Sequence, residues 1–291
     1  MKKRVVCAAL VSIMTMSLAA CSGGAVSAPA ETKAESTEAK TEAAEITEKA
    51  AEAEGETKAE GGTLIVGFDQ DFPPMGFMGD DGEYTGFDLE LAQEAAKRLG
   101  LEYKPQPIAW DAKDMELESG NIDCIWNGFT MTGREDGYTW SEPYMENSQV
   151  FVVAGDSGIK SQADLAGKVV ECQVDSSAEA ALKEVPDLTA TFAQLLTTAD
   201  YNTAFMDLEQ GAVDAIAMDV VVAGYQISQR NADFVILEDS LAAEEYAIGF
   251  KKGNTELKDK VQGALEEMAA DGTLKTISEK WFGKDITTIG K

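Results

Sequence analysis

The sequence contains no histidine. This absence excludes nucleophile activation of the Ser-His-Asp and Cys-His types, acid–base catalysis by imidazole, and every metal site with a histidine ligand. There is also no P-loop, and the glycines at Gly76, Gly79 and Gly82 do not form a dinucleotide-binding fingerprint. We therefore expect neither a metal nor a cofactor, and most familiar hydrolase mechanisms are excluded.

Cysteine is scarce. Cys7 and Cys21 lie near the N-terminus, and Cys124 and Cys172 lie in the body of the chain without C-x-x-C spacing. This spacing supports neither a zinc site nor a redox dithiol. We expect two small buried residues on strands at Cys124 and Cys172, and the sequence leaves open a disulfide between them because it cannot place their Cα atoms.

Positive charge is in short supply, with 24 Lys and Arg against 52 Asp and Glu and a net charge of -28. Such an acidic surface repels phosphate backbones, so nucleic acid is not expected as a partner. The hydrophobic fraction of 44% is ordinary for a soluble globular protein. The length of 291 residues allows one large domain or two lobes.

The apolar run at 5–20 is shorter than the roughly 20 residues that a spanning helix needs. It follows the cationic residues 1–4, so residues 1–20 are predicted to be an export signal. The run ends in Leu-Ala-Ala-Cys at 18–21, which resembles the lipobox of bacterial lipoproteins and implies lipidation of Cys21. An uncleaved signal anchor is the alternative.

Residues 22–61 consist almost wholly of Ala, Glu, Thr, Lys, Ser and Gly, without an aromatic residue. A segment of this composition cannot bury enough apolar surface to fold. We therefore predict an acidic, disordered tether over residues 21–62.

From Thr63 onward, short apolar runs alternate with amphipathic segments. This alternation predicts α/β units around mostly parallel sheets, whose ligands bind outside the carboxyl ends of the strands. The segment after Asp88 is predicted to be a helix that Asp88 caps and that Gly100 ends. The predicted strands are 63–68, 121–126, 149–154, 168–174, 213–218, 233–237 and 246–250.

Nine sequence blocks resemble the polar-amino-acid-binding proteins of bacterial ABC importers, extracellular solute-binding family 3. They occur in the family's order and lie at 66–75, 86–92, 110–112, 119–123, 127–134, 140–144, 173–178, 211–215 and 270–273. The resemblance implies a two-lobed, type II periplasmic-binding-protein-like α/β clamp. Its lobes would be residues 63–150 plus 247–291 and residues 151–246, with hinge strands at 149–154 and 246–250.

The resemblance implies a monomeric binding protein, not an enzyme, that closes around an L-amino acid and delivers it to a cognate ABC permease. It would be extracytoplasmic, either lipid-anchored to the outer face of the membrane through Cys21 or periplasmic. Two alternatives stay open: a dehydratase on the same fold, and a sensory ligand-binding module.

The resemblance also assigns the charged contacts. Arg134 would hold the ligand's carboxylate with a planar bidentate fork, and Asp219 would hold the ammonium group. Ser176 and Ser177 would present backbone N–H groups at a helix N-terminus to the carboxylate. A surface ion pair for Arg134, and helix caps for the two serines and Asp219, are the structural alternatives.

The remaining contacts surround the ligand's side chain. Phe72 and Trp110 would form aromatic walls, unless they are plain core residues. Asp69 would face the side-chain end, which favours a cationic or amide side chain over an acidic one. The other assigned ligand contacts are Asn127, Gly128, Phe129, Thr130 and Gln173.

Overall fold

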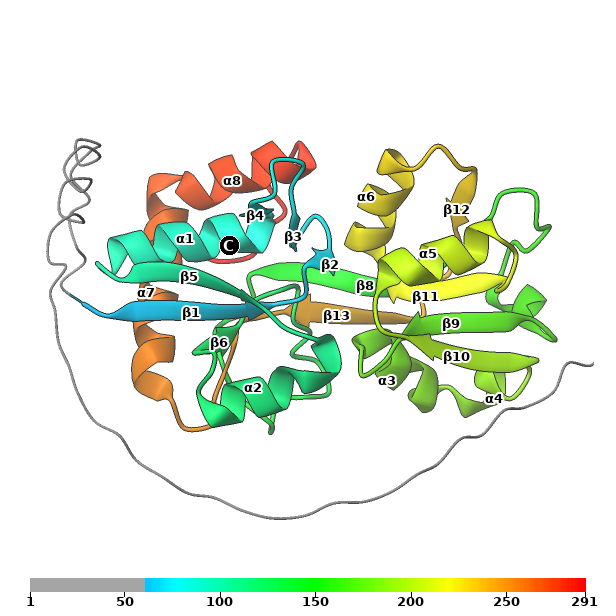
Figure 1. Ribbon diagram of the computed structural model, residues 1–291, viewed down its shortest axis with the longest axis horizontal. Helices are drawn as coiled ribbons and strands as arrows, with labels where there is room; N and C mark the ends of the chain where they lie inside the picture. The colour runs from blue at the N-terminus through cyan, green and yellow to red at the C-terminus, as the bar shows by residue number, and fades with distance from the viewer. Residues whose placement is uncertain (1–60) are drawn as a thin grey trace, which may run out of the picture. The chain divides into compact units, whose positions relative to one another are not determined.

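The computed structural model describes residues 61–291. They form two α/β lobes, each with its own sheet (Figure 1). The predicted export signal, the lipidation at Cys21 and nearly all of the predicted tether lie outside the described residues. No helix in residues 61–291 is long and apolar enough to cross a membrane.

Lobe 1 is built on a five-stranded sheet in the order β5-β1-β6-β14-β7, in which β1 pairs parallel with β5 and β6. A small sheet β2-β3-β4 lies beside it. The strands are β1 Thr63–Phe68, β2 Asp71–Phe72, β3 Gly76–Met78, β4 Tyr84–Thr85, β5 Glu102–Pro107, β6 Cys124–Ile125, β7 Thr139–Trp140 and β14 Gly249–Phe250. The helices are α1 Phe87–Arg98, η1 Trp110–Ala112, α2 Lys113–Ser119, α7 Thr255–Asp271 and α8 Thr273–Phe282.

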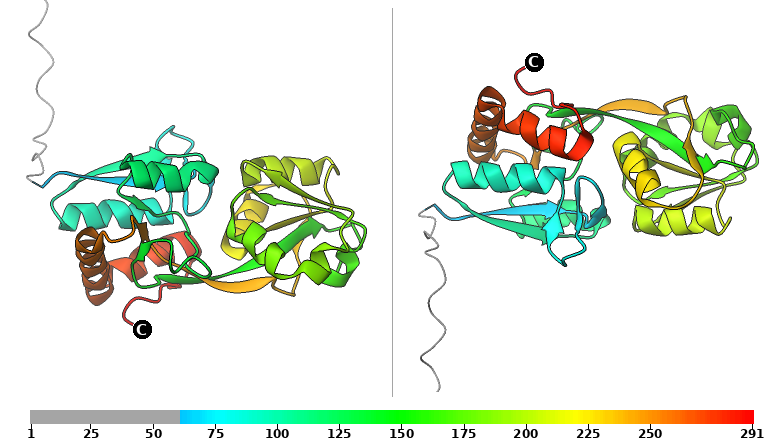
Figure 2. Two further views of the ribbon diagram at one scale, coloured as in Figure 1. Left: turned by 90° about the horizontal axis from the view of Figure 1, so that it is seen from below. Right: turned by 90° about the horizontal axis from the view of Figure 1, so that it is seen from above.

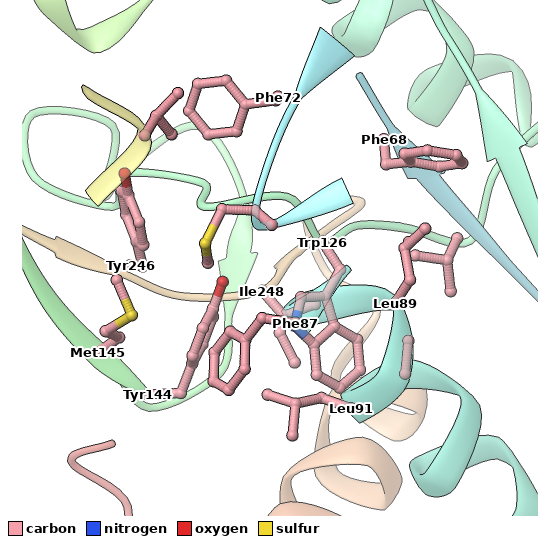
Figure 3. Packing of buried hydrophobic residues seen from close by; sticks show 14 of the residues in the cluster. Phe68, Phe72, Phe87, Leu89, Leu91, Trp126, Tyr144, Met145, Tyr246 and Ile248 are labelled. Carbon is pink, nitrogen blue, oxygen red and sulfur yellow. The ribbon is translucent and has the colours of Figure 1, made fainter. Parts of the chain in front are cut away.

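Side chains of β1 alternate between the two faces of this sheet. Leu64 and Val66 pack in one apolar cluster with residues of α1, α7 and α8, whereas Ile65 packs in another with Leu117 of α2. Helices therefore cover both faces (Figure 1). Figure 3 shows part of the first cluster, where Tyr144 lies beside Phe87.

Lobe 2 is built on the sheet β10-β9-β11-β8-β12, with β13 also paired to β8. Its helices pack on both faces, because alternate residues of β11 join the clusters of α3 and of α5 and α6. The strands are β8 Met145–Ala154, β9 Val169–Gln173, β10 Gln194–Thr198, β11 Ala215–Asp219, β12 Phe234–Ile236 and β13 Ala242–Tyr246. The helices are η2 Gln162–Leu165, α3 Ser177–Glu184, α4 Pro186–Thr189, α5 Tyr201–Glu209 and α6 Val220–Gln229.

Both sheets are mixed, and the expectation of mostly parallel sheets was wrong. The long strand β8 pairs antiparallel with β11, β12 and β13, and β14 pairs antiparallel with β6 and β7. The reason is that the chain crosses between the lobes twice, and the returning strand runs opposite to the outgoing one.

The two crossing strands are β8 and β13, which pair from Met145 opposite Tyr246 to Gln149 opposite Ala242 (Figure 2). The segment predicted as a hinge at 149–154 lies within β8, and the segment predicted at 246–250 begins at Tyr246, the last residue of β13; their role as hinges stays a prediction. Gly249 and Phe250 belong to the sheet of lobe 1. The crossing residues are rich in Glu, Asn and Gln, so the apolar pattern of a buried strand did not reveal them.

The predicted cap of α1 was wrong. The helix begins at Phe87 after Gly86, and Asp88 lies inside it with its side chain fully buried. Its C-terminal end agrees with the prediction, since Gly100 follows the last turn with a φ of +66°. Cys124 and Cys172 are buried on β6 and β9, as predicted, and both are free thiols.

Candidate functional site

One cavity between the lobes is lined by every predicted contact residue except Phe129. Its volume is about 10 Å³, which is space for about one water molecule. An amino acid can therefore enter only if the lobes separate or lining side chains turn. The lining residues are Asp69, Phe72, Trp110, Asn127, Gly128, Thr130 and Arg134 of lobe 1 and Gln173, Ser176, Ser177 and Asp219 of lobe 2.

The guanidinium of Arg134 is held by backbone carbonyls. Its Nη1 donates to the carbonyl of Thr130 at 3.2 Å, and its Nη2 donates to the carbonyl of Asp175 in lobe 2 at 3.4 Å. Within residues 61–291 it forms no ion pair with a carboxylate. In so acidic a chain, an unpaired guanidinium in a cavity can accept a ligand carboxylate.

Phe129 is the one predicted contact that is not among the residues lining the cavity, and its assignment as a ligand contact stays a prediction. Its side chain is fully buried and packs edge-on against Trp110 at 5.5 Å between ring centroids. The guanidinium carbon of Arg134 lies 5.4 Å from the centroid of the Phe129 ring. The Phe129 ring therefore stabilises the guanidinium of Arg134 through a cation–π contact.

Thr130 has an unused hydroxyl. Its Oγ1 is buried at the cavity and has no hydrogen-bond partner in the described part of the chain. A buried hydroxyl without a partner costs about 1–3 kcal/mol. A polar ligand group in the cavity would satisfy it.

Asp219, at the end of β11, is 3% exposed and is held by neutral donors. Its Oδ1 accepts hydrogen bonds from Asn147 Nδ2 at 2.8 Å, Gln149 Nε2 at 2.7 Å and the Tyr246 hydroxyl at 2.6 Å. Burial, followed by the charge of nearby Glu244, raises the pKa of Asp219 well above its usual value. The site therefore favours a positive partner, which would restore the charged form of Asp219.

Asn147, Gln149, Glu244 and Tyr246 were missed as site residues. They lie on the crossing strands β8 and β13, in the register that places Glu244 opposite Asn147. The only signal for them was the alternation along β8, where residues 145, 147 and 149 point inward and residues 146 and 148 are exposed or half-buried. This signal is weak.

Asp69 also lines the cavity, and it directly follows the last residue of β1. Its Oδ2 accepts a hydrogen bond from Gln173 Nε2 of lobe 2 at 2.6 Å, and its Oδ1 accepts one from the backbone N–H of Asp71 at 2.9 Å. Burial is the main cause that raises the pKa of Asp69 to about 6. A nearby Asn202 Nδ2 donates to Asp71 across the lobes at 2.8 Å.

The aromatic walls are nearly buried. Phe72 is 6% exposed and packs on Tyr201 of lobe 2, with 6.0 Å between ring centroids. Trp110 is 9% exposed, and the ammonium of Lys113 lies 5.2 Å from the centroid of its ring. Lys113 also forms an ion pair with Asp175, which joins the lobes beside the cavity.

The two serines sit at the start of α3. Ser176 Oγ accepts a hydrogen bond from the backbone N–H of Glu179 at 3.1 Å, so Ser176 is the helix cap. Ser177 Oγ accepts one from Gln149 Nε2 at 2.9 Å. Both residues line the cavity, so the cap does not exclude contact with a ligand.

The backbone of Gly128 is held by a hydrogen bond to the buried side chain of Asp88. Its N–H donates to Asp88 Oδ2 at 2.5 Å, and the Tyr144 hydroxyl donates to the same oxygen at 2.8 Å. Gly128 has a φ of +55°, and a Cβ there would meet the rings of Phe72 and Tyr246 at 3.0 Å. Figure 3 shows the side chains of Phe72, Tyr144 and Tyr246. Burial raises the pKa of Asp88 to about 7.

Residues 64–284 match the family of bacterial extracellular solute-binding proteins, family 3. The chain belongs to this family. It is 36% identical over 231 residues to the L-cystine-binding protein TcyJ of Escherichia coli strain K12, covering 78% of this chain and 85% of TcyJ.

Two solved structures of the family's fold are similar to this chain. One is an ABC uptake transporter substrate-binding protein from Streptococcus pneumoniae with bound histidine, with 36% identity, a TM-score of 0.76, and coverage of 78% of this chain and 94% of that chain. The other is the ancestral amino acid-binding protein AncCDT-1, a precursor of cyclohexadienyl dehydratase, with 32% identity, a TM-score of 0.69, and coverage of 76% and 95%. Together they agree with the expected type II fold.

Proposed function

We propose that this protein is the substrate-binding component of an ABC importer and holds an L-amino acid between its lobes. The observation that carries the proposal is the pairing of opposite charges at one cavity. Arg134 of lobe 1 and Asp219 of lobe 2 both line it, and within residues 61–291 neither has a countercharge in an ion pair. An amino acid supplies both missing charges.

The residues around the ligand then have distinct roles. Arg134, with the N-terminus of α3 at Ser176 and Ser177, binds the carboxylate. Asp219 and the hydroxyl of Thr130 bind the ammonium group. Phe72, Trp110, Asp69 and Gln173 surround the side chain, and the carboxylate of Asp69 favours a cationic or amide side chain. The names of TcyJ and of the histidine-bound relative support an amino acid as the ligand.

Binding requires the lobes to open and close. Within residues 61–291, β8 and β13 are the strands that pair along the crossing between the lobes, so bending there leaves each lobe's core intact. The ligand stabilises the closed form because it contacts both lobes at once. The permease would then recognise the closed protein, which acts as a monomer.

The test is calorimetry with the twenty amino acids and cystine on protein freed of bound ligand. We expect micromolar or tighter binding of at least one of them, and Arg134→Ala should lower its affinity strongly. Arg98→Ala is the matched control, because Arg98 pairs with Glu94 and Asp271 away from the cavity. No heat with any amino acid would sink the proposal.

We also propose that residues 1–20 are removed on export and that a lipid on Cys21 anchors the protein outside the cytoplasmic membrane through the tether. The composition of residues 5–61 supports this. In membrane fractions, Cys21→Ala should move the protein to the soluble fraction. Retention of this variant on membranes would contradict the anchor.

We propose that the protein has no enzymatic activity. The relative TcyJ is named as a binding protein. The precursor of a dehydratase among the similar structures makes one reaction worth testing. Incubation with prephenate or arogenate should yield no product, and any turnover above the uncatalysed rate would overturn this part of the proposal.

A further inference from the structure

Asp219 shares its hydrogen-bond donors with a second buried carboxylate. Asn147 Nδ2 lies 2.8 Å from Asp219 Oδ1 and 2.5 Å from Glu244 Oε1. Gln149 Nε2 lies 2.7 Å and 2.8 Å from the same two oxygens. Asp219 is 3% exposed and Glu244 is 7% exposed, so water screens neither carboxylate well.

No cation in residues 61–291 forms an ion pair with either carboxylate. Two adjacent buried negative charges with only neutral donors are strongly unfavourable, and such pairs hold one proton between them. The groups that face the pair are Asn147 and Gln149 from β8, Tyr246 from β13, Ser177 from α3, Tyr201 from α5 and, across the cavity, Arg134.

The amide hydrogens are also too few. Gln149 Nε2 has two hydrogens, yet it lies within hydrogen-bond distance of three acceptors, namely Ser177 Oγ, Asp219 Oδ1 and Glu244 Oε1. The amide oxygens of Asn147 and Gln149 are buried without partners. One additional proton between the carboxylates would relieve this shortage, and this argument is independent of their charge.

We propose that Asp219 and Glu244 share one proton in the ligand-free protein, and that the ammonium group of the bound amino acid takes the place of this proton. The O–H bond of the carboxyl group breaks, its electron pair stays on the carboxylate oxygen, and the proton passes to solvent. The inference rests on the proposed function, since it needs an ammonium group at Asp219. Glu244 is thereby a positioning residue of the ammonium site, although it does not line the cavity.

Replacement of the shared proton by the ammonium group determines the direction in which ligand affinity changes with pH. Binding releases the shared proton, so affinity falls as pH falls wherever the ligand-free protein carries that proton. The slope approaches about tenfold per pH unit for one proton. Burial and the charge of Glu244, which raise the pKa of Asp219, place this effect above the range of an ordinary carboxylate.

The test is calorimetry at about pH 6 with L-arginine, L-glutamine and L-cystine, none of which changes its charge near that pH. Titrations in two buffers of different ionisation enthalpy give the number of protons released per bound ligand. The wild type should release close to one, and Glu244→Gln should release less than half as many. Glu245→Gln is the matched control, because Glu245 is the exposed neighbour that pairs with Glu146 on the other face of β13.

Asp69 is the competing source of a proton in this cavity, since its pKa is raised to about 6. Asp69→Asn should retain most of the proton release. Its loss in Asp69→Asn, and not in Glu244→Gln, would overturn the assignment to the pair. Binding without proton release in the wild type would overturn this inference and leave the proposed function intact, whereas no binding by any amino acid would overturn both.

Infrared spectroscopy of the ligand-free protein provides a readout that needs no ligand. A protonated-carboxyl band should be present in the wild type and in Glu245→Gln and should lose intensity in Glu244→Gln. If Glu244→Gln does not fold, adding the bound amino acid to the wild type must remove the same intensity. An unchanged band in both comparisons would overturn the shared proton.

Discussion

The carboxylates of Asp69 and Asp219 line one cavity, and they are held in different ways. Asp69 directly follows β1 of lobe 1, Asp219 is the last residue of β11 of lobe 2, and each is nearly buried. The Oδ1 of Asp219 is bound by three side chains of the crossing strands β8 and β13. By contrast, Asp69 is bound by Gln173, which reaches it from the opposite lobe.

This difference separates a fixed subsite from an adjustable one. Opening of the lobes would leave Asp219 with the same partners, because they lie on β8 and β13, which pair directly beside it. Opening would separate Asp69 from Gln173. A preorganised anion suits the ammonium group that all amino acids share, whereas an anion whose partner changes on closure suits the side chain that varies.

The largest expected effect tests the fixed subsite. Asp219→Asn removes the anion opposite the ammonium group and should weaken every amino acid ligand by about 3–5 kcal/mol. Calorimetry with several ligands measures this loss. Asp156→Asn, at an exposed position of lobe 2, should change none of them. Retained affinity in Asp219→Asn would show that the fixed subsite lies elsewhere.

A third buried aspartate, Asp88, provides a comparison with Asp69 and Asp219. Its hydrogen-bond partners Gly128 and Tyr144 belong to lobe 1, so opening of the lobes should not change its surroundings. Its pKa of about 7 in the folded protein lies above the value of an unfolded aspartate, so the folded state binds the extra proton between about pH 4 and pH 7. The free energy of unfolding should therefore fall as pH rises through this window, by about 2–3 kcal/mol between pH 5 and pH 8.

Urea unfolding at the two pH values measures this change. In Asp88→Asn the asparagine stays neutral, so most of the difference contributed by this residue should vanish. An equal pH dependence in the variant and the wild type would mean that Asp88 is already ionised in the folded protein. Asp69→Asn should keep the Asp88 contribution, which separates the two aspartates.

The adjustable subsite is tested by selectivity. Asp69→Asn should weaken binding of L-arginine by about 1–2 kcal/mol more than binding of L-glutamine, because only the cationic side chain loses a charged partner. The ratio of the two affinities, measured by competition, is the readout. Glu171→Gln is the control variant, since Glu171 is buried on β9 yet does not line the cavity. Equal losses for both ligands would place Asp69 with the fixed subsite.

Most cavity residues could be predicted from the sequence because they lie at the ends of apolar strands. The carboxyl ends of such strands meet at one edge of each sheet. The prediction failed for Glu244 and Asn147. A strand rich in polar residues has the same sequence pattern as an exposed segment, and only the pairing of β8 with β13 shows that these two side chains are buried. The prediction also missed β5, whose prolines Pro105 and Pro107 argue against a central strand. The structure places β5 at the edge of its sheet, where proline is tolerated.

Phe129 shows a different limit. Its position beside Gly128 and Thr130 indicated the cavity, but neighbouring residues of an extended chain point to opposite sides. Thr130 lines the cavity and Phe129 enters the aromatic cluster beneath Arg134. Resemblance identified the segment, whereas the direction of each side chain depended on how the segment pairs with the rest of lobe 1.

The smallest expected effect concerns the ion pair between Lys113 and Asp175, which joins the lobes outside the cavity. The side chain of Lys113 is 2% exposed, but that of Asp175 is 53% exposed, so the pair should stabilise the closed form by only about 0.5–1 kcal/mol. Asp175→Asn should therefore enlarge the ligand-free protein in small-angle scattering and lower affinity by about two- to fivefold. Glu256→Gln, which breaks the exposed pair with Lys260 in α7, is the control that should do neither. If Asp175→Asn lowered affinity as much as Asp219→Asn, closure rather than the ammonium contact would dominate binding, and the distinction between fixed and adjustable subsites would lose its basis.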